Sequence, residues 1–247
     1  VVEMGDRMVP RMMDEIAGNM LKSWCKSKGV RILTDTKITE IAKHDKGLKV
    51  SLSKGKIPPA QLVVTAAGVR SNIDFLKGSG IDTDAGVVVD NHLQTNVEGI
   101  YAAGDVVQAL DLSTGKFSVL AIQPTAVEHG RIAAMNMAGL DTPHRGSLSM
   151  NVLDTLGLIS SSFGKWMGEK GSDTARVVDK ANYRYLRLEF QGERLIGAQS
   201  VGLIEHIGML RGLIQTGTRL GEWKQRLMTA PNRIAEAYVS TLHQNKS

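Results

Sequence analysis

The chain has 247 residues, of which 42% are hydrophobic and 4% aromatic, with a formal net charge of +5 and one cysteine. This length allows one large domain or two small ones. No secretory signal opens the chain, and no apolar run approaches the roughly 18 residues of a membrane helix, so we expect no membrane partner. Basic residues alternate with acidic ones and few aromatic rings are available to stack on bases, which argues against nucleic-acid binding. One cysteine excludes an internal disulfide framework and favours a reducing, cytoplasmic compartment.

Residues 1–82 predict the later half of an α/β domain. Apolar residues at helical spacing between Met13 and Trp24 predict a helix that Gly29 ends. The strands expected after this helix are Val30–Leu33, Lys37–Ala42, Leu48–Leu52 and Leu62–Ala66.

Two further parts follow. In residues 83–145 we expect strands at Val87–Asp90 and Ile100–Ala103, then a helix that starts near Pro124, since proline is tolerated in a first helical turn. In residues 146–247 the alternating patterns of Tyr183–Phe190 and Leu195–Val201 predict a hairpin. Three helices are expected after it, at Glu205–Thr216, Leu220–Met228 and Asn232–His243, which gives a smaller α+β carboxyl-terminal interface domain.

The segment Thr95–Asp105, TNVEGIYAAGD, has the pattern of a ligand-binding strand end. Gly104 allows another molecule to approach the backbone closely. Asp105 places a carboxylate outside the strand end, where open α/β sheets bind ligands. Because an ionised carboxylate only accepts hydrogen bonds, polyol hydroxyls are natural partners for it.

This segment resembles the second FAD-binding motif of the pyridine nucleotide-disulfide oxidoreductase family. Segments in the order typical of that family are residues 1–3 with Arg7 and Pro10, then 29–30, 62–72, 86–90 and 123–139. The resemblance covers residues 1 to about 145. The family's two glycine-rich G-x-G-x-x-G turns are missing. We therefore expect the carboxyl-terminal portion of a longer enzyme. In this portion as it stands, FAD and NADH binding should be badly weakened, because the phosphate-cradling turns are absent.

The resemblance implies a flavin site around Asp105, which would hold the ribityl chain beside Gly104. At the helix start, Pro124, Thr125 and Ala126 would lie at the pyrimidine edge of the flavin, where the positive end of a helix stabilises negative charge. This segment reads equally as an ordinary core helix when taken alone.

A nicotinamide site is implied by Glu3, Ala67 and Gly68. At the end of the first strand, Glu3 would accept hydrogen bonds from the adenosine ribose and favour NADH over NADPH; alone, it is equally an ordinary surface residue. Ala67 and Gly68 would allow close approach of the nicotinamide, or would form a tight turn with no ligand.

The fold class expected is α/β, with partial doubly wound nucleotide-binding domains before the terminal α+β domain. The function expected is that of an FAD-dependent NADH oxidoreductase of the rubredoxin-reductase and NADH-oxidase-like branch, passing electrons to a small acidic carrier protein. A basic terminal region would suit that carrier, through Arg211, Arg219, Lys224, Arg226 and Arg233.

Two alternatives stay open. One is a thiol-dependent NADH oxidase or a coenzyme A-disulfide or polysulfide reductase, and the other is a non-catalytic module that dimerises through its last part. No catalytic residue is assigned: Cys25 is read as a buried hydrophobe and His129 as a helix-face histidine. The six histidines have no metal-ligand spacing, so no metal is expected. Ser113–Lys116 resembles the tail of a P-loop but lacks its flanking residues.

Overall fold

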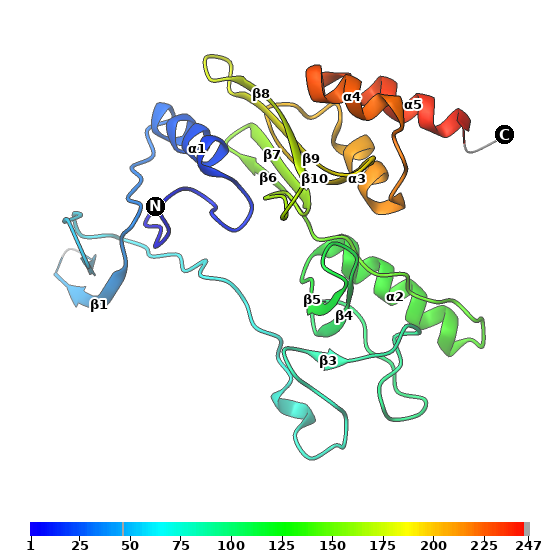
Figure 1. The fold of residues 1–247 in the computed structure, drawn as a ribbon. Helices are drawn as coiled ribbons and strands as arrows, with labels where there is room; N and C mark the ends of the chain where they lie inside the picture. Colours follow the sequence, from blue (N-terminus) through cyan, green and yellow to red (C-terminus); the bar gives the residue numbers. More distant parts are fainter. Residues whose placement is uncertain (46, 245–247) are drawn as a thin grey trace.

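A computed structural model describes residues 1–45 and 47–244. Residue 46 and residues 245–247, which the expected first and last parts include, lie outside the described residues. Figure 1 shows three groups of elements: α1 with the β1–β2 hairpin, a small sheet with α2, and a five-stranded sheet with α3, α4 and α5. The fold is mixed α/β with several sheets.

The first group contains the predicted helix, α1 (Glu15–Ser27). It begins at Asp14, whose side chain accepts a hydrogen bond from the Ala17 backbone N–H at 3.0 Å, as helix N-caps do. It is followed by an antiparallel hairpin of β1 (Ile38–His44) and β2 (Gly47–Leu52), close to the expected ranges. The helix and both of these strands are confirmed.

Two strands expected in this group do not form. Residues 30–33 contribute only a single parallel bridge, between Leu33 and Val2. Residues 62–66 are extended without pairing, and Leu62 and Val64 are 77% and 78% exposed. The apolar pattern of this segment suits a parallel strand, but no strand in the described part of the chain lies beside it to pair with.

The middle sheet consists of β3 (Val87–Val88), parallel to β4 (Val107–Asp111), which is antiparallel to β5 (Lys116–Val119). The predicted helix is confirmed as α2 (Gln123–Met137), whose Ile132 and Ala133 join the core of this sheet. The expected strand at residues 100–103 is wrong: only Tyr101 forms a bridge there, with Gln94. The expected strand ended before Asp105, whereas the observed strand, β4, begins after it. The sequence analysis missed β4.

The terminal sheet is antiparallel with the strand order β6-β7-β10-β9-β8. The predicted hairpin is confirmed as β9 (Arg184–Gln191) and β10 (Arg194–Val201). The three strands that were not predicted are β6 (Met150–Thr155), β7 (Leu158–Gly164) and β8 (Asp173–Asp179).

The two faces of this sheet are covered by different elements (Figure 1). One face packs Phe163, Leu186 and Leu188 against the three predicted helices. These helices are α3 (Ile207–Thr216), α4 (Glu222–Thr229) and α5 (Ile234–Gln244).

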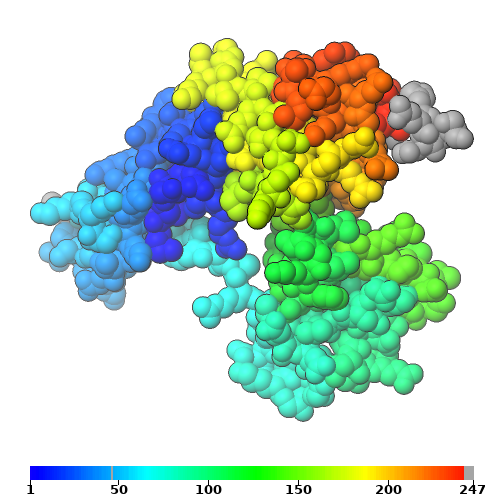
Figure 2. Space-filling model, in the orientation of Figure 1, coloured from blue at the N-terminus to red at the C-terminus, as the bar shows by residue number. Residues whose placement is uncertain are grey.

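The other face receives α1, with Met13 and Leu21 against Tyr185 and Val201. Figure 2 shows the amino-terminal residues in blue against the yellow-green strands of this sheet. Across the described ranges, no helix combines the length and apolarity needed to cross a bilayer.

Candidate flavin-binding site

The middle sheet positions a turn at residues 104–105 directly before β4. Gly86 lets the strands approach, since a Cβ atom at Gly86 would lie 2.5 Å from the carbonyl oxygen of Val106. The Val107 N–H then donates to the Gly104 carbonyl at 3.0 Å, which closes the turn. Gly104 has a φ of 84°, in the left-handed region that favours glycine.

The turn lies against the start of α2. A Cβ atom at Gly104 would lie 3.5 Å from the Cβ atom of Ala126, so the backbone of the turn faces the first helical turn. The structure therefore brings together two segments that are separated by about twenty residues in the sequence, as the flavin interpretation requires.

The first turn of α2 keeps the donor character expected of a free helix N-terminus. Its N-cap is Ile122, which offers no side-chain hydrogen bond, and Pro124 occupies the first turn. Thr125 is buried, whereas Gln123 and Pro124 are exposed. Because no side chain caps this end, its N–H groups and its positive dipole are available to an acceptor on a ligand.

Asp105, the residue after Gly104 in this turn, is exposed. Its backbone carbonyl accepts a hydrogen bond from the Ser71 hydroxyl at 3.1 Å. In the part of the chain that the structure describes, no group bonds the Asp105 carboxylate. The site thus offers a carboxylate that can accept hydrogen bonds from hydroxyl groups, and helix N–H groups that can donate to a carbonyl oxygen. These two groups fit the polyol chain and the pyrimidine edge of a flavin, respectively. Sequence reasoning did not single out Ser71, although it lies within the 62–72 segment of the resemblance.

The residues expected at a nicotinamide site come from the amino terminus and from the segment after β2. The Glu3 carboxylate accepts a hydrogen bond from the Gly5 N–H at 2.7 Å, and the Glu3 backbone pairs with Leu33 and Thr36. Ala67 and Gly68 are exposed in the unpaired segment after residue 61. In Figure 1 the amino terminus and β4 belong to separate groups of elements.

A buried histidine pair lies behind the flavin candidate. The His129 and His144 rings meet edge to face at 4.7 Å, and their Nε2 atoms lie 3.2 Å and 3.0 Å from the Ser147 hydroxyl. Burial, together with the neighbouring His144, lowers the pKa of His129 to about 4. Burial also lowers the pKa of His144. The pair is therefore a neutral contact in the core, and the sequence analysis missed His144.

Two other interpretations are confirmed. Ser113–Lys116 belongs to the β4–β5 hairpin, where Asp111 accepts hydrogen bonds from the Ser113 N–H and the Thr114 hydroxyl, at 2.8 Å and 3.0 Å. Cys25 is buried in α1, and desolvation raises the pKa of its thiol, as is typical of an unreactive cysteine.

Comparison with known proteins supports the sequence resemblance. A family model described as "Pyridine nucleotide-disulphide oxidoreductase" matches residues 1–130. The chain is 28% identical to the NADH-dependent phenylglyoxylate dehydrogenase subunit epsilon of Aromatoleum evansii, over 97% of this chain and 58% of that protein. It is 26% identical to the NADH-rubredoxin oxidoreductase of Clostridium acetobutylicum, over 78% of this chain and 46% of that protein.

A solved structure shares the fold. The NAD-dependent persulfide reductase of A. fulgidus is 28% identical and matches with a TM-score of 0.79, over 90% of this chain and 45% of that one. The chain thus spans about half the length of these relatives. With more than half of its residues matched by the family model, the chain belongs to the pyridine nucleotide-disulphide oxidoreductase family.

Proposed function

We propose that this chain supplies the ribityl- and pyrimidine-binding part of an FAD-dependent NADH oxidoreductase. The observation that carries the proposal is the approach of Gly104 to Ala126, which sets the turn that carries the exposed Asp105 beside an uncapped helix N-terminus. FAD, when bound, accepts hydride from NADH and passes electrons onward. The residues of this chain bind and orient it.

Each residue of the site has a separate task in this proposal. Asp105 accepts hydrogen bonds from the ribityl hydroxyls, and the absence of a side chain at Gly104 leaves the backbone open to the cofactor. Pro124, Thr125 and Ala126 place the helix N-terminus at the pyrimidine edge, where its dipole stabilises negative charge. Glu3 holds the ribose of NADH, and Ala67 and Gly68 give the nicotinamide access.

The proposed domains follow the predicted divisions. Residues 1–82 are the later half of an NAD-binding domain and residues 83–145 the carboxyl-terminal segment of an FAD-binding domain, both parts of doubly wound folds. Residues 146–247 are an α+β interface domain, through which homodimers would form.

For the electron acceptor we propose a small carrier protein such as rubredoxin, supported by the name of the Clostridium relative. The basic terminal helices give less support to an acidic carrier than the sequence indicated, because their charges are largely matched within the chain. Lys224 pairs with Asp173 at 2.6 Å, and Arg226 with Glu222 at 3.4 Å. Arg219 and Arg233 likewise pair with Glu193 and Glu236, while Arg211 bonds Gln215.

A thiol-dependent reductase is the second candidate, favoured by the persulfide reductase that shares the fold. An acceptor assay tests the carrier proposal. The protein reconstituted with FAD is mixed anaerobically with NADH, and oxidised rubredoxin is then added. Reoxidation of the flavin band by rubredoxin supports the carrier proposal, and a band that stays bleached contradicts it. The thiol-dependent candidate would need a cysteine upstream of Val1, because the one cysteine of this chain, Cys25, is buried.

The nicotinamide assignment is tested with the same spectrum. NADH should bleach the flavin band faster than NADPH, and Glu3→Ala should reduce this difference, because the carboxylate then no longer repels the 2′-phosphate. Equal rates for both cofactors in the unmodified protein would contradict the role of Glu3.

A further inference from the structure

The face of the terminal sheet that receives α1 is unlike its other face. The contact contains four methionines from the amino-terminal segment: Met8, Met12, Met13 and Met20. They pack against Leu158, Tyr185 and Val201. Methionine side chains are flexible and adapt to irregular surfaces, so a contact built on them tolerates rearrangement better than the Leu- and Phe-rich core on the opposite face.

A charged group fastens the start of α1 to this face. The Asp14 carboxylate accepts hydrogen bonds from the Tyr185 hydroxyl and, at 3.2 Å, from the Arg187 guanidinium. Arg187 also bonds the buried Glu189 at 2.6 Å, and Glu189 is further bonded by Thr174. The Glu189 carboxylate thus has its hydrogen-bond partners within the sheet. Asp14, the N-cap of α1, brings a second carboxylate to Arg187.

The same contact leaves polar atoms without partners. Gln199 and Ser162 face each other on β10 and β7, and both side chains are fully buried. Among the described residues, nothing bonds the Gln199 Nε2 atom or the Ser162 hydroxyl, although Gln199 Oε1 accepts from the Asp14 N–H at 3.2 Å. Burying unpaired polar atoms opposes the docking of α1, because both atoms regain hydrogen bonds to water when α1 departs.

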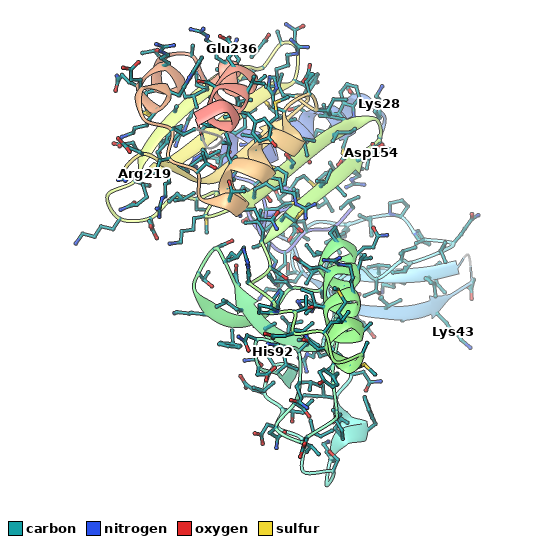
Figure 3. The ribbon with its side chains drawn as sticks, turned by 90° about the vertical axis from the view of Figure 1, so that its right-hand side faces the viewer. Lys28, Lys43, His92, Asp154, Arg219 and Glu236 are labelled. Atoms are coloured by element: carbon teal, nitrogen blue, oxygen red, sulfur yellow. The ribbon has the colours of Figure 1, made fainter. Side chains whose placement is uncertain are left out.

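Two hairpin turns of the sheet contact the other end of α1, and each contains a residue in a strained backbone conformation. Leu156 and Tyr183 have φ angles of 52° and 53°, in a region that turns usually assign to glycine or asparagine. Both contact Trp24: its indole N–H donates to the Thr155 and Leu156 carbonyls at 2.8 Å and 3.2 Å, and its ring meets the Tyr183 ring at 5.1 Å. In Figure 3, Lys28, just after α1, and Asp154 of β6 lie on the same side of the molecule.

We propose that α1 and the preceding residues 8–14 form a releasable clasp on the terminal sheet. The clasp is closed at one end by Asp14 on Tyr185 and Arg187, and at the other by Trp24 on the two hairpin turns. It opens as a unit while the sheet stays folded, because the sheet keeps its own core against α3, α4 and α5. Residues 1–5, which include Glu3, are bonded to residues 31–36 and move with the clasp when it opens. This inference does not depend on the flavin assignment.

Hydrogen exchange of the full chain, followed by mass spectrometry, tests the clasp. Peptides from α1 should exchange at least tenfold faster than peptides from the centres of β9 and β10, since opening of the clasp requires less than global unfolding. Equal protection of α1 and of the sheet would overturn the proposal, because α1 would then be released only when the whole unit unfolds.

Two conservative variants, one on each side of the contact, make the test specific. Asp14→Asn keeps a good N-cap but loses the charge that Arg187 bonds, and Tyr185→Phe keeps the buried ring but removes the hydroxyl. Each should raise the exchange rate of α1 about tenfold and leave β9 and β10 unchanged. The matched control is Asp173→Asn, which removes a carboxylate that bonds Lys224 and should change neither rate. Faster exchange of both α1 and the sheet, or no effect of either variant, would contradict the clasp.

Discussion

The neutral histidine pair behind the candidate flavin site should make the stability of the protein depend on pH. His129 is 2% exposed on α2, next to His144 and the Ser147 hydroxyl. Burial disfavours its charged form and lowers its pKa to about 4 from the ordinary histidine value of 6.5. The variant His129→Gln keeps a polar side chain but removes the titrating group.

The size of the pH effect on the free energy of unfolding follows from the difference in the His129 pKa between the folded and unfolded states. The unfolded chain binds a proton at His129 as the pH falls through 6.5, whereas the folded protein does so only near pH 4. Between these values the unfolded state binds more protons, so the free energy of unfolding falls as the pH falls. Each pH unit of this difference corresponds to about 1.4 kcal/mol, which gives a loss of about 3 kcal/mol from His129 over the whole window.

The assay has two parts. NMR titration of the histidine Cε1 protons, assigned with His129→Gln, should give a His129 pKa well below that of a free histidine. Urea unfolding at pH 7 and near pH 4 should then show an acid-induced loss of stability that is about 3 kcal/mol smaller in the variant than in the unmodified protein. A His129 that titrates near pH 6.5, or identical pH dependence for both proteins, would contradict a buried, neutral His129.

Three further changes test the packing by urea unfolding. Phe163→Ala removes a fully buried ring from the terminal core and should cost about 3–5 kcal/mol; a cost below about 1 kcal/mol would contradict the assigned core. Gly197→Ala would bring a Cβ atom to 2.2 Å from the Lys165 carbonyl carbon, whereas the control Gly130→Ala, in α2, meets nothing within 4 Å, so the first should be much more destabilising. Val64→Thr should change stability by less than about 0.5 kcal/mol, since Val64 is 78% exposed, and a larger loss would indicate that the segment is packed.

The helices could be predicted from sequence because their apolar residues recur at a fixed spacing and their ends carry recognisable signals. Asp14 and Gly29 mark the ends of α1, and Pro124 marks the start of α2. The β9–β10 hairpin was equally readable, because a short turn separates two β-rich segments. Local signals sufficed for these elements.

The missed strands lack such signals. In β7, Ser160, Ser161 and Ser162 are fully buried although serine usually marks turns, and the Ser161 hydroxyl compensates by bonding Ser200 at 2.7 Å. The opposite error occurred at residues 62–66, where a strand-like pattern has no neighbouring strand in the described chain. Burial in a sheet depends on partners that are distant in sequence, so neither case could be decided locally.

The candidate site was predicted only in part for the same reason. Gly104 and Asp105 were recognised from the motif, and the start of α2 from Pro124. Their mutual approach, expressed in the distance from Gly104 to Ala126, and the hydrogen bond from Ser71 depend on the tertiary fold.

The role of Asp105 in binding FAD is the central claim, and an equilibrium titration with FAD, followed by flavin fluorescence, tests it most directly. The titration should extend to high FAD concentrations, and it compares the unmodified chain with Asp105→Ala and with the control Glu98→Ala, another exposed carboxylate of the same group. A charge-assisted hydrogen bond contributes about 1.5–3 kcal/mol, so we expect saturable binding that Asp105→Ala weakens at least tenfold and that Glu98→Ala leaves unchanged. Equal affinity of the Asp105 variant and the unmodified chain, or no saturable binding at all, would contradict the claim.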